Sequence, residues 1–559
     1  MIGKRSIRGM QPARLYGTIL FAIVFAASPL LFGQAKPASD AHRVSSVWNP
    51  DNGDGTYRNP VLYADYSDPD VIRVGDDFYM VSSSFGEVPG LPILHSRDLV
   101  NWELIGHGFE RQPPIEVYRT PQHGNGAWAP SLRYHAGEFF IFYPDPNYGI
   151  YMIKSHSMRG PWSDPLLIKA AKGWIDPCPL WDDDGKAYLI NGLAASRAGV
   201  KASLVLSRMS ADGTKLLDGG AIVIDGHNQD PTLEGPKIYK RHGYYYVFAP
   251  AGGVPNGWQV VYRSKAIYGP YERRVVLAQG TTAINGPHQG AWVDTAEGED
   301  WFLHFQDLGP YGRVVRLEPM HWGSDDWPAI GVHISSAGIG EPVTSFKKPK
   351  TRAVAPAYTP AESDEFGAPA IGLQWQWQAN PEASWAFPVP ALGVLRLINV
   401  PVGGTDVNLW NVPNVLAQKF PGPEFTVTAK LRFTSRFKGE QTGLAILGRS
   451  YSALVIENGG EGLVVKQVTR EHADQDGQNV ESAAVAVQSD TFYLRAQVEK
   501  DAMVAFSFSL DGTEFHPIGT HFHATPGGWI GAKVGIFAIG KSTQGEFGYA
   551  DYDWIRFAR

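Results

Sequence analysis

The chain has 559 residues and a formal net charge of -7. This length exceeds a single hydrophobic core of ordinary size, so we expect two domains. Lysine and arginine are scattered without blocks, which excludes the basic stripe of a protein that binds nucleic acid. Glycine (62) and proline (41) are abundant, and long helical heptads are missing. The composition therefore favours an all-β protein with many short strands.

The N-terminus has the pattern of an export signal. Four basic residues precede an apolar run over 19–32, and Gly33-Gln34-Ala35 follows with small residues at its two ends. We expect residues 1–35 to be a signal peptide that is cleaved, which leaves a secreted or periplasmic protein with no membrane attachment. The alternative is a retained anchor, but Pro29 interrupts a run shorter than the ~20 residues of a spanning helix. Cys178 is the only cysteine, so no internal disulfide is expected.

A short pattern occurs five times between residues 68 and 305. Each copy begins beside proline or glycine, continues into a short strand, turns through Gly or Asp, and returns in an aromatic strand. The aromatic strands cover 78–81, 139–142, 187–190, 244–247 and 301–304. The copies recur about every 50 to 60 residues, the length of a four-stranded propeller blade with its loops. Residues 36–345 are therefore expected to form a five-bladed β-propeller.

The first residues of the five copies, here called the anchors, are Asp68, Trp128, Asp176, Glu234 and His288. The innermost strand of each blade lines the central channel of a propeller, so the anchors should meet around one axis. Cleavage of a glycosidic bond needs two carboxyl groups, one to protonate the departing oxygen and one to activate water or to attack directly. A single Asp-Pro is commonly just a turn, but acids at the same place in three blades indicate a shared site.

Three carboxyl groups in one funnel should repel each other and raise the pKa of at least one, which keeps an acid protonated near neutral pH. Glutamate reaches further and has the higher ordinary pKa, so Glu234 suits the general acid and Asp68 the base. Asp176 would then orient and tune the acid. Asp68 and Glu234 belong to non-adjacent blades, so we expect ~6.5–9.5 Å between their carboxyl groups and a reaction with inversion.

The second part of the chain has a different pattern. Residues 346–362 are rich in Lys, Pro, Ala and Thr without periodicity, which is typical of a linker. Residues 363–559 alternate apolar and polar positions, which predicts a β-sandwich. The expected strands include 425–433, 443–447, 462–468, 504–510, 534–539 and 552–557.

Four anchors in their local context resemble those of glycoside hydrolase family 43. They are Asp68-Pro-Asp, Trp128-Ala-Pro, Asp176-Pro and Glu234-Gly-Pro. The resemblance runs from about residue 59 to residue 331 and includes the segments 82–102 and 304–322. It implies that Asp68 is the general base, Asp176 the modulator of the acid's pKa and Glu234 the general acid of an inverting hydrolase.

The resemblance also implies substrate contacts by Phe85, Trp128 and Arg313. An aromatic ring packs on the apolar face of a sugar, and a guanidinium can hold two hydroxyls. Phe85 could equally be a core residue, and Arg313 a salt-bridged blade residue. His288 has no acid–base duty here. Members of the family often hold a cation near this histidine, so the resemblance allows a structural Ca²⁺ at His288, while no cofactor is required for the reaction.

The second domain, with Ser-Asp-Glu-Phe at 363–366, resembles the C-terminal sandwich of the β-xylosidase branch of that family. In that branch a sandwich loop closes one end of the funnel, so only a terminal sugar fits. This implies an exo-acting β-xylosidase or α-L-arabinofuranosidase acting on hemicellulose-type oligo- or polysaccharides. Two alternatives stay open. First, the sandwich could serve solely to bind carbohydrate or to stabilise the chain. Second, the whole protein could be a non-catalytic carbohydrate-binding propeller.

Overall fold

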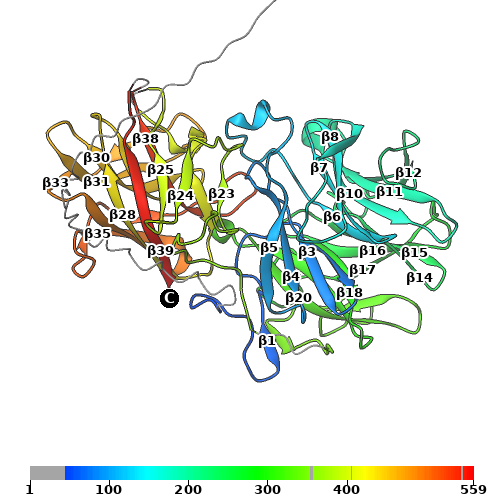
Figure 1. Cartoon of the computed structure of the whole chain (residues 1–559). Helices are drawn as coiled ribbons and strands as arrows, with labels where there is room; N and C mark the ends of the chain where they lie inside the picture. The colour runs from blue at the N-terminus through cyan, green and yellow to red at the C-terminus, as the bar shows by residue number, and fades with distance from the viewer. Residues whose placement is uncertain (1–43, 353–356, 405, 543–544) are drawn as a thin grey trace, which may run out of the picture.

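The computed structural model describes residues 44–352, 357–404, 406–542 and 545–559, and the fold is almost entirely β (Figure 1). The predicted signal peptide, residues 1–35, lies outside the described residues. In the described part of the chain, no helix is long and apolar enough to cross a membrane. The short helices are α1 (Ala195–Ala198) and the 3-10 turns Val117–Arg119, Gly309–Tyr311, Leu409–Asn411 and Lys500–Ala502.

Within the described ranges, residues 70–330 form five four-stranded antiparallel sheets, and the strand order in each follows the chain. The first two blades are β2–β5 (Asp70–Val74, Asp77–Val81, Gly90–Ser96, Trp102–Phe109) and β6–β9 (Ser131–His135, Glu138–Asp145, Gly149–Ser155, Leu166–Ala170). The third and fourth are β10–β13 (Trp174–Trp181, Ala187–Leu193, Ser203–Met209, Ala221–Asp225) and β14–β17 (Lys237–Arg241, Tyr244–Ala251, Trp258–Ser264, Glu272–Leu277). The fifth is β18–β21 (His288–Asp294, Asp300–Asp307, Arg313–Trp322, Pro328–Ile330). Each expected aromatic strand is the second strand of a blade, so the propeller prediction is confirmed.

The propeller is closed by pairing between its two ends. Strand β1 (Thr56–Arg58) pairs with β22 (Ser345–Lys347), and the Tyr57 hydroxyl donates a 2.7 Å hydrogen bond to the Leu317 carbonyl in the last blade. The Tyr57 bond ties β1 to the fifth blade, and the β1–β22 pair joins the same strand to the segment that follows that blade. The first two residues of the predicted linker, 346–347, thus belong to a strand of the propeller end.

The second domain is a sandwich of two sheets, in agreement with the prediction (Figure 1). Among the described residues, one sheet contains β23 (Gln376–Trp377), β26 (Val400–Pro401), β27 (Leu416–Lys419), β29 (Gln441–Leu447), β30 (Tyr451–Asn458), β31 (Leu463–Arg470), β32 (Val480–Glu481), β33 (Val485–Val487) and β38 (Lys533–Gly540). The other contains β24 (Ala386–Val389), β25 (Val394–Ile398), β28 (Phe425–Thr434), β34 (Thr491–Val498), β35 (Met503–Ser509), β36 (His516–Pro517), β37 (Phe522–His523) and β39 (Tyr549–Ala558). All six expected strands are present. Their inward-facing apolar side chains form one core between the sheets.

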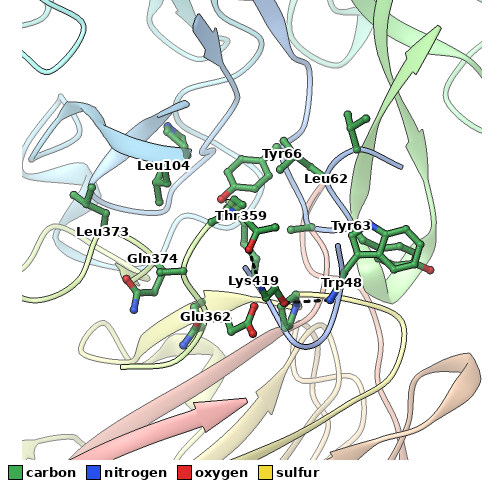
Figure 2. Close-up of a pocket in the computed structure, with 18 of the residues that line it drawn as sticks. Trp48, Leu62, Tyr63, Tyr66, Leu104, Thr359, Glu362, Leu373, Gln374 and Lys419 are labelled. Atoms are coloured by element: carbon green, nitrogen blue, oxygen red, sulfur yellow. Dashed lines mark hydrogen bonds between the residues drawn. The ribbon is translucent and has the colours of Figure 1, made fainter. Parts of the chain in front are cut away.

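The two domains pack directly on each other. Val88 of the first blade and Trp377 of the sandwich exchange backbone hydrogen bonds of 3.0 and 2.6 Å. A cavity of about 60 Å³ lies in the seam, with Tyr63 and Tyr66 on the propeller side and Lys419 on the sandwich side (Figure 2). The Lys419 ammonium lies 5.4 Å from the centre of the Tyr66 ring, and burial lowers the pKa of Lys419 to about 8. These contacts fix the sandwich beside the funnel of the propeller.

Candidate active site

A cavity of about 380 Å³ lies where the inner strands of the five blades begin. This volume falls in the range of ~300–1,000 Å³ that is usual for small-ligand sites. Every predicted site residue lines it. They are Asp68, Phe85, Trp128, Asp176, Glu234, His288 and Arg313. The propeller therefore brings the five anchors together, as the repeat pattern predicted, and adds Phe85 from the loop between β3 and β4 and Arg313 from the start of β20.

The Asp68 carboxylate is held by three donors. Its Oδ2 accepts hydrogen bonds from the hydroxyls of Ser67 at 2.8 Å and Ser83 at 2.5 Å. The Arg313 guanidinium forms an ion pair with Oδ1 at 3.2 Å. Asp68 is buried, and hydrogen bonds to a carboxylate in such a place stabilise the negative charge and fix its direction. These three contacts therefore fix the position and direction of the Asp68 carboxyl group.

Asp176 is the buried acid beside Glu234. Its Oδ2 accepts a 2.8 Å hydrogen bond from the backbone N–H of Gly235. Burial, followed by repulsion from the carboxylates of Glu234 and Asp68, raises the pKa of Asp176 to about 8. Burial and the repulsion among the three acids therefore favour retention of a proton at the Asp176–Glu234 pair near neutral pH. Asp176 is almost fully buried while the Glu234 side chain is 31% exposed, so burial acts most strongly on Asp176.

This shift makes Asp176 a pH-dependent cost to stability. Between its ordinary pKa of 3.8 and about 8, the folded protein binds the proton more tightly than the unfolded chain, so stability falls as the pH rises through this window. In Asp176→Asn this loss is absent. We expect the Tm of the variant relative to wild type to rise by at least ~2 °C between pH 5 and pH 8, as measured by thermal denaturation. A Tm difference that does not change with pH would contradict the burial of an acid here.

His288 contacts the expected general acid. Its Nε2 lies 3.0 Å from Oε1 of Glu234, and the ring is buried. Calcium binds six to eight oxygen ligands, whereas His288 offers nitrogen, and among the described residues no three His, Cys, Asp or Glu side chains are grouped to hold a metal ion. The residues around His288 thus do not fit a calcium site built from protein ligands. The observed contact indicates that His288 orients Glu234.

The wall of the cavity is aromatic. Phe85 meets Trp128 edge to face, with ring centres 6.2 Å apart. The guanidinium of Arg313 lies 4.8 Å from the centre of the Phe305 ring, and it also holds Asp68. Arg313 is therefore a salt-bridged blade residue that also lines the cavity, and its contact with substrate stays a prediction. Phe85 is likewise both buried and part of the lining.

Trp529 completes this wall and was not predicted. It lies in the loop between β37 and β38 of the sandwich, is 51% exposed, and lines the cavity of the other domain. Its ring centre is 6.2 Å from that of Trp128 and 5.7 Å from the guanidinium carbon of Arg313. The Gly527-Gly528-Trp529 sequence could have indicated this residue. An aromatic residue that lies between two strands and follows two glycines is suited to an exposed loop.

The backbone is strained at this cavity. The φ angles of Asp68, Phe85, Asp176 and Trp529 are 56°, 51°, 55° and 65°. Residues with a side chain avoid this left-handed region at a cost of about 1–2 kcal/mol each. Such residues cluster where the surrounding structure imposes a conformation for function. At these four positions the surrounding structure therefore imposes the backbone conformation that directs the side chain.

Comparison with known proteins agrees with this geometry. Residues 57–328 match the model of glycosyl hydrolases family 43, and residues 363–558 match that of the β-xylosidase C-terminal concanavalin A-like domain. A putative beta-xylosidase of Xylanibacter ruminicola is 40% identical over 487 residues, covering 87% of this chain and 86% of the relative. The non-reducing end alpha-L-arabinofuranosidase BoGH43B of Bacteroides ovatus is 28% identical over 541 residues, covering 90% and 94%.

Among solved structures, the GH43 protein BlXynB of Bacillus licheniformis has a TM-score of 0.77 and 27% identity, covering 90% of this chain and 99% of its own. The similarity thus spans both domains. The two family models match the propeller and the sandwich, and the relatives match along most of their length. This chain belongs to glycosyl hydrolases family 43 and is a glycoside hydrolase.

Proposed function

We propose that the enzyme is an exo-acting, inverting hydrolase that releases terminal xylose or arabinose from hemicellulose-type glycans. The observation that carries this proposal is one cavity lined by three acids and bounded by Trp529 from the second domain. Trp529 reaches both Trp128 and Arg313, so the sandwich covers one side of the funnel. A covered funnel accepts the end of a glycan chain more readily than its middle, which supports exo action.

The relatives support a pentose as the released sugar. One carries the name putative beta-xylosidase and another the name non-reducing end alpha-L-arabinofuranosidase. A terminal β-D-xylopyranose and α-L-arabinofuranose present similar hydroxyls and linkage geometry to one pocket. The aromatic wall and the Arg313 guanidinium are suited to the apolar face and to the hydroxyls of such a ring.

The chemistry follows from the contacts of the acids. Asp68, held by Ser67, Ser83 and Arg313, would take a proton from the attacking water. Glu234 would protonate the departing oxygen. Because His288 holds Oε1 of Glu234, Oε2 is the oxygen left to face the substrate. Asp176 and Glu234 disfavour being charged together, so the pair retains a proton, and Glu234 carries it when it acts as the acid beside Asp176. The proposed steps use no metal or cofactor.

A direct test uses nitrophenyl β-xyloside, nitrophenyl α-arabinofuranoside and a series of xylooligosaccharides. We expect release from at least one aryl glycoside and only single pentoses from the oligosaccharides. Activity should persist after treatment with EDTA. Release of longer fragments would contradict exo action, and binding without release from any substrate would favour the alternative of a non-catalytic carbohydrate-binding propeller.

We also propose export to the periplasm or the medium. The support is the N-terminal pattern of basic, apolar and small residues, together with a carbohydrate substrate of polymer origin. Deletion of residues 1–35 should leave the enzyme in the cytoplasmic fraction, as measured by cell fractionation and activity. Equal distribution of the full-length and deleted forms would contradict export.

A further inference from the structure

A buried carboxylate joins the two domains beneath the cavity wall. Asp65 is 5% exposed and is not among the residues that line the cavity. Its Oδ1 accepts a 2.9 Å hydrogen bond from the backbone N–H of Arg313 in the propeller, and its Oδ2 accepts a 3.0 Å bond from the backbone N–H of Gly531 in the sandwich. Each oxygen thus holds a different domain.

The two backbone segments that Asp65 holds touch each other. A Cβ added at Gly531 would lie 2.6 Å from the nitrogen of Gly312, and one added at Gly312 would lie 2.5 Å from the Cβ of Asp65. The N–H of Ala532 donates a 2.7 Å bond to the Pro310 carbonyl beside them. The sandwich loop therefore approaches the start of β20 so closely that no side chain fits at Gly531, and none fits at Gly312 because Asp65 occupies that space.

The same two segments carry the side chains that meet over the base. Arg313 follows Gly312 directly, and Trp529 lies two residues before Gly531. The Arg313 guanidinium lies 5.7 Å from the centre of the Trp529 ring and 3.2 Å from Oδ1 of Asp68. A guanidinium within about 6 Å of an indole is attracted to it. One carboxylate thus sets the relative position of a cation, an aromatic wall and the base.

A lysine in the seam between the domains favours the charged form of Asp65. Burial raises the pKa of Asp65, while the Lys419 ammonium and the two backbone donors oppose that rise. Lys419 lines the seam cavity shown in Figure 2. A charged carboxylate accepts stronger hydrogen bonds from two N–H groups than a neutral amide does. The seam therefore contributes to the contact that Asp65 makes with both domains.

We propose that Asp65 is a positioning residue that holds Trp529 against Arg313 and so builds the sugar-binding wall beside Asp68. It touches no substrate and acts through Trp529. This inference rests on the proposed function and adds to it, because it identifies the bond by which the sandwich becomes part of the active site.

A double-mutant cycle tests this role. In Asp65→Asn one oxygen is replaced by an amide that cannot accept, so one of the two backbone bonds is lost. We expect kcat/KM on nitrophenyl β-xyloside or α-arabinofuranoside to fall ~10–100-fold, mainly through KM, because a displacement of about 1 Å at a binding site has effects of that size. In a Trp529→Ala background the same substitution should change kcat/KM less than about threefold.

Two further variants complete the cycle. Gly531→Ala displaces the loop while Asp65 stays intact, and it should reproduce the loss of Asp65→Asn. It carries the test alone if Asp65→Asn does not fold. Asp300→Asn is the matched control. Asp300 is a partly buried carboxylate of the fifth blade that accepts hydrogen bonds from the indole N–H groups of Trp292 and Trp322. It should leave KM unchanged.

The outcomes separate this inference from the proposed function. Independent, multiplicative losses for Asp65→Asn and Trp529→Ala in an active enzyme would overturn the role of Asp65. Absence of glycosidase activity in the wild type would instead overturn the proposed function. In that case calorimetry measures the Kd for xylose in the wild type, the two single variants and the double variant. Non-additive losses of binding free energy support the positioning role, and additive losses refute it.

Discussion

Glu234→Gln is expected to slow hydrolysis of xylooligosaccharides or alkyl glycosides by ~10²–10⁴-fold, the usual contribution of general acid catalysis. Glycosides with a dinitrophenol leaving group should lose far less, because that group departs without a proton. The glutamine side chain can still accept a hydrogen bond from His288, so the variant keeps a contact equivalent to the 3.0 Å bond between His288 and Glu234. The measurement is a plot of log kcat/KM against the pKa of the leaving group for both enzymes.

A matched control exists in the fifth blade. Glu318 forms a similar pair with His304, with 3.2 Å between Oε1 and Nε2, and lies outside the cavity. Glu318→Gln should lower the Tm and leave the slope of the leaving-group plot unchanged. If Glu234→Gln lost activity equally on good and poor leaving groups, Glu234 would not be the acid.

Much of the propeller was predictable because the information is local and occurs five times. Each blade begins at an anchor and returns in an aromatic second strand, and β3, β7, β11, β15 and β19 are found there. The anchors converge because every inner strand starts at the same end of the funnel. A hypothesis about one Asp-Pro would be weak, but the same slot in several blades places Asp68, Asp176 and Glu234 in one cavity.

The contacts between domains were not predictable from local patterns. Asp65 and Gly531 are 466 residues apart, and their hydrogen bond depends on how the sandwich docks. The position of Trp529 at the cavity likewise depends on how the sandwich docks on the propeller. The partner of His288 was also not predicted. From the sequence an imidazole at this position could contact either a cation or a carboxylate, and only its distance to Glu234 identifies the carboxylate. Periodicity identifies elements and their faces, whereas these residues depend on the surface that each loop reaches.

Asp68→Asn is expected to lower kcat by ~10²–10⁴-fold on every substrate, whatever its leaving group, because activation of water is needed in each case. An amide keeps the bond to the Arg313 guanidinium but cannot take a proton from water. Asp70→Asn is the control from the same segment. Asp70 is fully buried, pairs with Arg133 at 2.8 Å and does not line the cavity, so its variant should lose stability and keep the leaving-group dependence of wild type.

The stereochemistry of the first product gives a second measure of the role of Asp68. A base that activates water needs room for that water, so its carboxyl group should lie ~6.5–9.5 Å from that of the acid, against ~5–5.5 Å for a nucleophile. Asp68 and Glu234 lie just before the first strands of the first and fourth blades, which are not adjacent, and both line the cavity. Proton NMR of a β-xyloside digest should therefore show α-xylose first. If β-xylose appeared first, Asp68 would act as a nucleophile, and a covalent sugar adduct on Asp68 should then be trapped by mass spectrometry.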